Sequence, residues 1–107
     1  MIDTNQLIAD AIQRIVIGFQ PDRIILFGSH VRGDATFDSD VDLMVIMEVE
    51  GSVRKKANEI DLALSDRTIP LDLIVLTPEM FQQQKTAPGG IVRQAIAEGK
   101  VVYEHAA

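Results

Sequence analysis

Three aspartates are the first residues in this sequence whose types and spacing could carry chemistry, and two of them form a closely spaced pair. Asp40 and Asp42 stand two residues apart at the start of the apolar run 41–47. Residues two apart in a β-strand point to the same face, so their carboxylates would repel each other unless a cation lay between them. Oxygen ligands of this kind suit Mg²⁺, which is typically bound by one or two carboxylates together with phosphate oxygens of a substrate.

Asp72 is the third candidate. It lies between Leu71 and Leu73 in the apolar run 71–76, where an unpaired charge would be costly to bury. A position beside Asp40 and Asp42 would remove that cost through a shared metal, and an edge position facing water would remove it equally well. Three carboxylates around one or two metal ions could support an in-line displacement at phosphorus.

A glycine-serine pair could bind the phosphates of a substrate beside such a metal site. Gly28 and Ser29 end the β-rich run 23–27, and a glycine at such a turn lets the backbone approach a phosphate closely. If a helix begins at this turn, its first amides and the Ser29 hydroxyl could hold the β- and γ-phosphates of a nucleotide. Arg32 could add a phosphate contact, or it could pair with Asp34 or Asp38.

Hydrophobic periodicity predicts the elements that position these residues. A first amphipathic helix is capped by Asp3 or Thr4 and ended by Gly18 and Pro21. A turn or short helix follows from His30. The other predicted helices are one capped by Ser52, one from Pro78 to about Lys85, and one between Gly90 and Gly99. The predicted strands are 23–27, 41–47, 71–76 and an edge strand at 101–103. The order α-β-α-β-α-β-α-α-β predicts an α/β (α+β) fold, with a single domain over residues 1–107 and a small mixed β-sheet flanked by helices.

Composition excludes several classes of protein. The 107 residues carry 10 basic and 16 acidic side chains, a formal net charge of -6. This balance argues against direct binding of nucleic acid, which needs a clustered basic surface. The chain has no cysteine, so disulfides, thiolate catalysis and cysteine zinc sites are excluded. No secretory signal and no apolar stretch of about 20 residues is found, so we expect no membrane association and a cytoplasmic location.

Taken together, the motifs resemble a known family. Gly28-Ser29, ten intervening residues and Asp40-Val41-Asp42 are similar to the signature of the DNA polymerase β-like nucleotidyltransferase superfamily. The fuller string, with Arg32-Gly33, Ser39 and Leu43, resembles its minimal nucleotidyltransferase (MNT) branch. The resemblance implies that Asp40 and Asp42 are metal ligands. It makes Asp72 the third carboxylate and base, and Gly28-Ser29 the triphosphate cradle for ATP.

The same resemblance implies a partner. MNT proteins are often encoded beside a HEPN-domain ribonuclease toxin and act as its antitoxin, in some cases by transferring AMP from ATP to a tyrosine of the toxin. Two alternatives stay open: transfer to a small molecule such as an aminoglycoside, and a non-catalytic antitoxin that neutralises its partner by contact. The sequence also leaves open the preferred base, the number of metal ions and the oligomeric state, a homodimer included.

Overall fold

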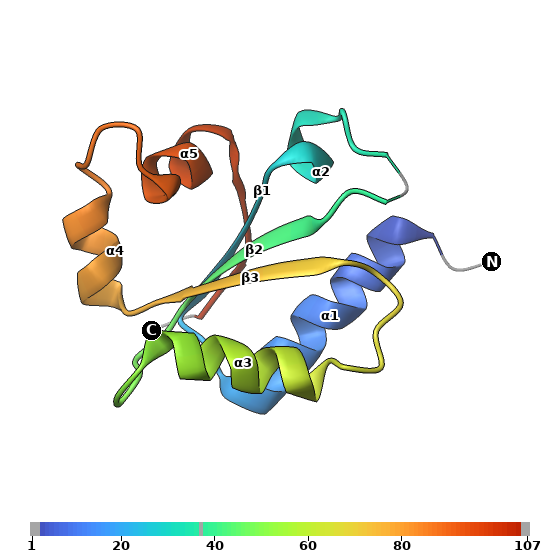
Figure 1. The fold of residues 1–107 in the computed structure, drawn as a ribbon, viewed down its shortest axis with the longest axis horizontal. Helices are drawn as coiled ribbons and strands as arrows, with labels where there is room; N and C mark the ends of the chain where they lie inside the picture. The colour runs from blue at the N-terminus through green and yellow to red at the C-terminus, as the bar shows by residue number, and fades with distance from the viewer. Residues whose placement is uncertain (1–2, 37, 106–107) are drawn as a thin grey trace.

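A four-stranded mixed β-sheet lies at the centre of the computed structural model, which describes residues 3–36 and 38–105 (Figure 1). The strands follow the order β3-β2-β1-β4 across the sheet. β1 is antiparallel to both of its neighbours, whereas β2 and β3 are parallel. The strand bounds are Arg23–Phe27 (β1), Val41–Ile46 (β2), Leu71–Leu76 (β3) and Lys100–Glu104 (β4).

Five helices connect and cover these strands in the predicted order, so the expected α+β architecture is confirmed. None of the helices in the described residues is long and apolar enough to cross a lipid bilayer. The helix bounds are Thr4–Phe19 (α1), Ser29–Arg32 (α2), Val53–Ala63 (α3), Pro78–Gln84 (α4) and Ile91–Glu98 (α5).

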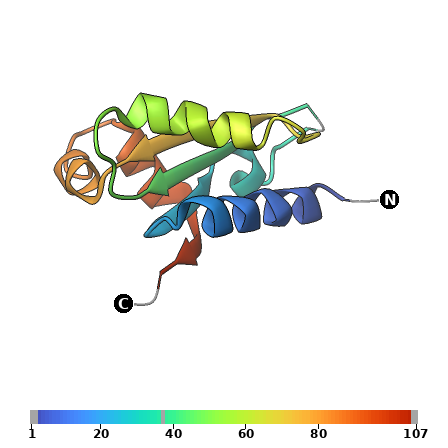
Figure 2. The ribbon, with the colours of Figure 1, turned by 90° about the horizontal axis from the view of Figure 1, so that it is seen from below.

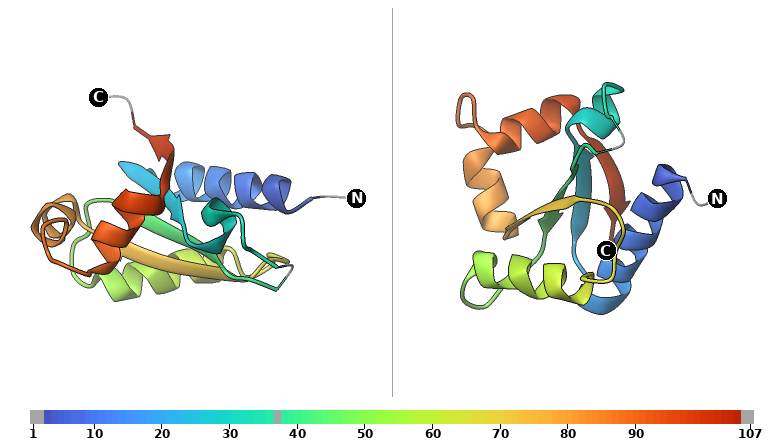
Figure 3. Two further views of the ribbon diagram at one scale, coloured as in Figure 1. Left: turned by 90° about the horizontal axis from the view of Figure 1, so that it is seen from above. Right: turned by 45° about the vertical axis from the view of Figure 1, so that its right-hand side comes forward.

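Each face of the sheet has its own apolar core, because side chains alternate along a strand. Leu43 and Val45 face the core that α1 and α3 complete with Ile15 and Ile60, and Figure 2 shows these two helices from below. The opposite face packs against α4 and α5, which lie together on the side away from α1 (Figure 3). The second core consists of Ile25, Phe27, Met44, Ile46, Leu76, Phe81, Val92 and Ala95.

Most helix ends follow the predicted signals. Asp3 caps α1 by accepting from the Gln6 amide at 2.8 Å, and Ser52 caps α3 by accepting from the Lys55 amide. The predicted stop at Gly18 is wrong, because α1 continues to Phe19. Gln20 takes the left-handed conformation there, with φ of 51° and its amide bonded to the carbonyl of Val16. A left-handed residue commonly ends a helix, but this position is usually glycine and here it is glutamine.

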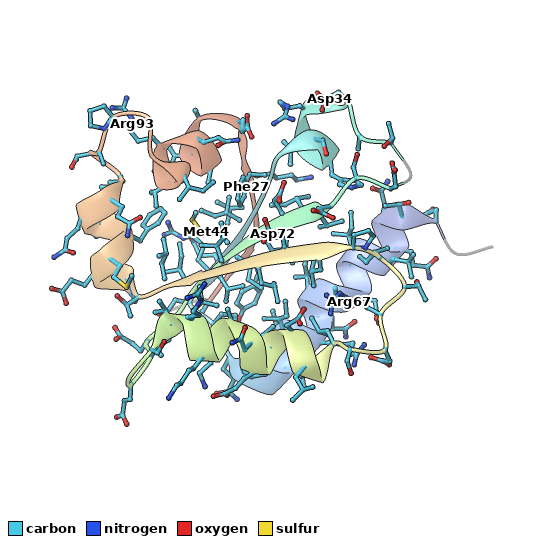
Figure 4. The ribbon with its side chains drawn as sticks, viewed as in Figure 1. Phe27, Asp34, Met44, Arg67, Asp72 and Arg93 are labelled. Carbon is cyan, nitrogen blue, oxygen red and sulfur yellow. The ribbon has the colours of Figure 1, made fainter. Side chains whose placement is uncertain are left out.

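Strand direction brings the candidate residues together. Because β1 runs opposite to β2 and β3, the end of β1 lies at the same end of the sheet as the starts of β2 and β3. Phe27, the last residue of β1, pairs with Asp42, and Asp42 pairs with Asp72. Figure 4 shows Phe27 and Asp72, which lie on the two strands that flank β2. One end of the sheet thus collects the glycine-serine turn and two of the three aspartates.

Candidate active site

Asp42 and Asp72 occupy directly paired positions of two parallel strands. Paired residues of neighbouring strands project to the same face, so their carboxyl groups lie beside each other. Asp42 is half-buried at the start of β2, and Asp72 is exposed at the start of β3. The pairing joins aspartates that are 30 positions apart in the sequence, as the predicted site requires.

The pKa of Asp42 is raised above its ordinary value, chiefly because burial penalises the charged form. The negative charges of Asp72 and Asp40 raise it further, and so does a hydrogen bond with the Asp72 carboxyl. The imidazole of His30 acts in the opposite direction. The carboxylates therefore repel one another at neutral pH, and a bound divalent cation would relieve that repulsion.

The structure corrects the expected strand position of Asp40 and selects between the two positions left open for Asp72. β2 begins at Val41, so Asp40 lies just outside the strand and is exposed. The alternation of strand side chains therefore does not explain how Asp40 and Asp42 share a face, and the direct strand partner of Asp42 is Asp72. Asp72 itself is exposed on an edge strand, so the water-facing edge position is the one observed of the two that the sequence left open.

Gly28 links the turn to the aspartates. Its φ of 85° and ψ of -156° lie in a region that only glycine readily adopts. A Cβ atom added to Gly28 would also overlap Oδ2 of Asp42. Space beside Asp42 is therefore one physical reason for the glycine, a reason that differs from the expected close approach to a phosphate.

Ser29 begins helix α2, so the helix that the phosphate-binding hypothesis for this turn requires is present. The amides of Val31 and Arg32 both donate to the carbonyl of Gly28 at 3.0 Å and so close the first helical turn. Within residues 3–36 and 38–105, the amides of Ser29 and His30 donate no hydrogen bond to a backbone carbonyl outside the helix, as is usual for the first positions of a helix. These two amides and the half-buried Ser29 side chain are the groups of the turn that could bind phosphate oxygens.

Arg32 reaches two acidic partners. Its Nε lies 3.5 Å from Asp34 Oδ1, one of the two pairings foreseen from the sequence, and its Nη1 lies 3.1 Å from Glu98 Oε1. Figure 4 shows Asp34 at the end of the molecule that carries α2. Arg32 keeps 44% of its side-chain surface exposed. Its guanidinium is thus held next to the turn and remains accessible to a ligand.

The donor set of the site fits Mg²⁺, because Asp40, Asp42 and Asp72 offer only carboxylate oxygens and crowd their charges together. Across the described part of the chain, no three acidic, histidine or cysteine side chains converge closely enough to form a ready-made metal site. Asp42 and Asp72 therefore form a preassembled pair, with Asp40 near enough for its charge to affect Asp42.

Two neighbouring residues were not assigned a role from the sequence. His30 is half-buried and its Nε2 lies 3.2 Å from the carbonyl oxygen of Ser39, so it connects α2 to the loop before β2. Glu98 contacts the turn from the end of α5. A sequence signal for Glu98 exists, since an acidic residue at a helix C-terminus opposes the helix dipole and calls for a local partner.

The comparison with protein families decides the identity of this fold and site. The family model described as "Polymerase beta, Nucleotidyltransferase" matches residues 10–107. The chain belongs to this family. It is therefore an enzyme of the nucleotidyltransferase class, and its Gly28-Ser29 turn and aspartate pair lie within the matched region.

Relatives of this nucleotidyltransferase are similar in sequence and in fold. The protein MJ0604 of Methanocaldococcus jannaschii, named as a protein adenylyltransferase, is 33% identical over 84 residues, which cover 76% of this chain and 77% of that protein. A toxin–antitoxin structure with AMP-PNP has a TM-score of 0.58 at 21% identity and covers 90% of this chain and 73% of its own. A structure of the toxin–antitoxin MntA-HepT has a TM-score of 0.56 at 17% identity, with coverage of 95% and 74%.

Proposed function

We propose that this nucleotidyltransferase transfers AMP from ATP to a partner protein in a Mg²⁺-dependent reaction. The observation that carries the proposal is the pairing of Asp42 with Asp72 beside the Gly28-Ser29 turn. Carboxylates and phosphate-binding groups at one end of a sheet are what transfer from a nucleoside triphosphate requires. The name of the Methanocaldococcus relative supports a protein as the acceptor, and the AMP-PNP complex of a protein with a similar fold supports ATP.

The proposed step is an in-line substitution at the α-phosphorus of ATP. An acceptor hydroxyl oxygen forms a bond to this phosphorus, while the bond from the phosphorus to the α,β-bridging oxygen breaks and pyrophosphate leaves. Asp72 takes the proton of the hydroxyl, and its exposed position gives an incoming acceptor access to it. The amides of Ser29 and His30, the Ser29 hydroxyl and Arg32 hold the phosphates in place.

Asp40, Asp42 and Asp72 are the residues that would hold Mg²⁺. When bound, the metal neutralises charge on the phosphates and lowers the pKa of the attacking hydroxyl. The half-buried Asp42 is fixed by its strand, and it orients the site from the middle of the sheet.

The proposed acceptor is a HEPN-domain ribonuclease toxin that the enzyme neutralises as its antitoxin in the cytoplasm. The toxin–antitoxin assemblies whose nucleotidyltransferase subunits share this fold support a toxin partner. The motif resemblance to the MNT branch supports the HEPN class. A hydroxyl-bearing side chain of the toxin, such as a tyrosine, would supply the attacking oxygen.

Label transfer tests this proposal. The protein is incubated with Mg²⁺ and with α-labelled or γ-labelled ATP, and a lysate of the source organism provides the acceptors. We expect one protein band labelled from the α position only, absent with Asp42→Asn, and its mass identifies the partner. Label in a small molecule would favour the small-molecule acceptor. ATP binding without any transfer, together with neutralisation of a toxin by Asp42→Asn, would favour the non-catalytic antitoxin.

Replacing Asp72 with asparagine is expected to separate chemistry from binding. Asparagine cannot accept the proton of the acceptor hydroxyl, so the transfer rate should fall about 10²–10⁴-fold, the usual contribution of a general base. ATP affinity should change less than tenfold, because the Gly28-Ser29 turn remains intact. Single-turnover kinetics and calorimetric ATP titration measure the two quantities. A variant that transfers AMP at the wild-type rate would remove Asp72 from the mechanism.

A further inference from the structure

Glu98, the last residue of α5, makes contacts that the transfer step does not use. Its Oε1 accepts hydrogen bonds from the backbone amide of Gly28 at 3.1 Å, from Nη1 of Arg32 at 3.1 Å and from Nε2 of Gln94 at 3.0 Å. Two of the three donors belong to the phosphate-binding turn and lie about 70 residues away in the sequence. One carboxylate oxygen therefore ties α5 to that turn.

The position of Glu98 is electrostatically unfavourable without these partners. A negative charge at the C-terminus of a helix faces the negative end of the helix dipole, and the chain already carries a net charge of -6. Hydrogen bonds from Gln94, from the Gly28 amide and from Arg32 lower the pKa of Glu98, so the carboxylate stays ionised. Its side chain is 24% exposed. The contacts to the turn thus offset a charge that the helix alone would disfavour.

Glu98 and Asp42 hold Gly28 from opposite sides. β1 lies between β2 and β4, and Asp42 belongs to β2, whereas Glu98 comes two residues before β4 begins. Figure 1 shows the end of α5 and helix α2 on the two sides of the upper end of β1. The side chain of Asp42 fills the space that a Cβ of Gly28 would need, while Glu98 fixes the Gly28 amide. Glu98 therefore acts on the backbone of the turn, away from the aspartate pair.

The next residue makes this approach feasible. A Cβ atom at Gly99 would overlap the carbonyl oxygen of Ala95 in α5 and would also come within 2.8 Å of Cγ2 of Ile25 in β1. A side chain at this position would therefore clash first with the last turn of α5 and then with β1, and glycine lets the chain pass between them. Gly99 thereby brings Glu98 within reach of Gly28.

From these contacts we propose that Glu98 is a positioning residue for the triphosphate of ATP. It fixes the direction of the turn that presents the Ser29 and His30 amides, and it holds Arg32 beside that turn. The proposal rests on the nucleotide site described under the proposed function. In this role Glu98 strengthens binding of the β- and γ-phosphates and does not act on the base or on the attacking hydroxyl.

Equilibrium binding to the full chain tests the proposal with Mg²⁺-ATP and, separately, AMP as titrants. For Glu98→Ala we expect the Kd for ATP to rise about tenfold, equivalent to about 1.4 kcal/mol, while the Kd for AMP changes less than twofold. Glu98→Gln keeps an oxygen acceptor for the Gly28 amide but loses the charge that attracts Arg32. Its Kd for ATP should therefore lie between that of the wild type and that of Glu98→Ala. Gln94→Ala removes the third donor only and serves as the matched control, with both Kd values unchanged.

The resonance of the Gly28 amide proton gives a second readout that does not depend on nucleotide. It should shift in both Glu98 variants and remain in place in Gln94→Ala, and melting curves establish that each variant is folded. If Glu98→Ala unfolds, Glu98→Gln decides the question. Wild-type ATP affinity in a folded Glu98 variant, or equal losses for ATP and AMP, would overturn the positioning role and leave the proposed function intact. Failure of the wild-type protein to bind ATP would remove both.

Discussion

Replacing Asp42 with asparagine is expected to abolish AMP transfer while the protein stays folded. The variant retains the shape of the side chain but loses the carboxylate whose pKa is raised by the charges of both Asp72 and Asp40. We expect the single-turnover rate to fall at least about 10²–10³-fold, the scale of losing one group that stabilises charge in a transition state. Asp10→Asn, at an exposed position of α1, is the matched control and should keep the wild-type rate.

Although Asp42→Asn is expected to lose activity, its stability should be equal to or higher than that of the wild type at neutral pH. The pKa of Asp42 is raised in the folded protein, so the folded state binds more protons than the unfolded state between the ordinary pKa and the raised one. The free energy of unfolding therefore falls as pH rises through that window and stays lower above it. Asparagine does not ionise, so the free energy of unfolding of Asp42→Asn does not fall in this window. In metal-free buffer it should melt at or above the wild-type temperature at pH 7, and the advantage should shrink towards pH 4. A variant that melts well below wild type at pH 7 would make Asp42 a structural residue.

Replacing Gly28 with alanine is expected to impair both stability and ATP binding. The backbone conformation at Gly28 carries a strain of about 1–3 kcal/mol for any other residue. The added methyl group would also displace the Asp42 side chain, and overpacking of this kind costs a further 1–3 kcal/mol, roughly. We expect the free energy of unfolding to fall by about 3 kcal/mol in urea titrations. ATP binding should be lost at concentrations where the wild type is saturated.

Gly51→Ala provides the control for this change. Gly51 also has a positive φ, of 92°, but nothing lies within 4 Å of the position of its Cβ. Its replacement should cost about 1–2 kcal/mol for the backbone alone and leave ATP binding unchanged. If Gly28→Ala lost no more stability than Gly51→Ala and still bound ATP, the close contact with Asp42 would have no functional weight.

Regular elements could be predicted from the sequence because their signals are local. The apolar spacing of α1 and the run 71–76 each define one element without knowledge of the rest of the chain. Helix caps at Asp3 and Ser52 depend on bonds to residues three positions away. The end of α1 was mispredicted because Gly18 fits inside the helix, while the choice of Gln20 as the left-handed residue depends on where the chain must turn.

The site could be predicted in outline, as a set of residues, but not in its contacts. The spacing of Gly28-Ser29 and Asp40-Val41-Asp42 indicated which residues belong together. The pairing of Asp42 with Asp72 depends on the parallel register of β2 and β3, which are joined by a long crossover through α3 and not by a short turn that would set the register. The position of Glu98 at a helix C-terminus signals that it needs a partner but not which one, since it reaches Gly28 only after β4 has paired with β1. The metal-ligand and phosphate-binding roles of these residues stay predictions.

The two paired aspartates differ in how firmly the fold supports them. Asp42 belongs to β2, which has a strand on both sides, whereas Asp72 belongs to β3 at the edge of the sheet, with hydrogen-bonded neighbours on one side only. Edge strands open more readily than central ones, because fewer bonds must break. We therefore expect the backbone at Asp42 to be held more firmly than the backbone at Asp72. In the proposed reaction, such a site would hold the nucleotide at Asp42 while the position of Asp72 adjusts to the surface of the acceptor protein.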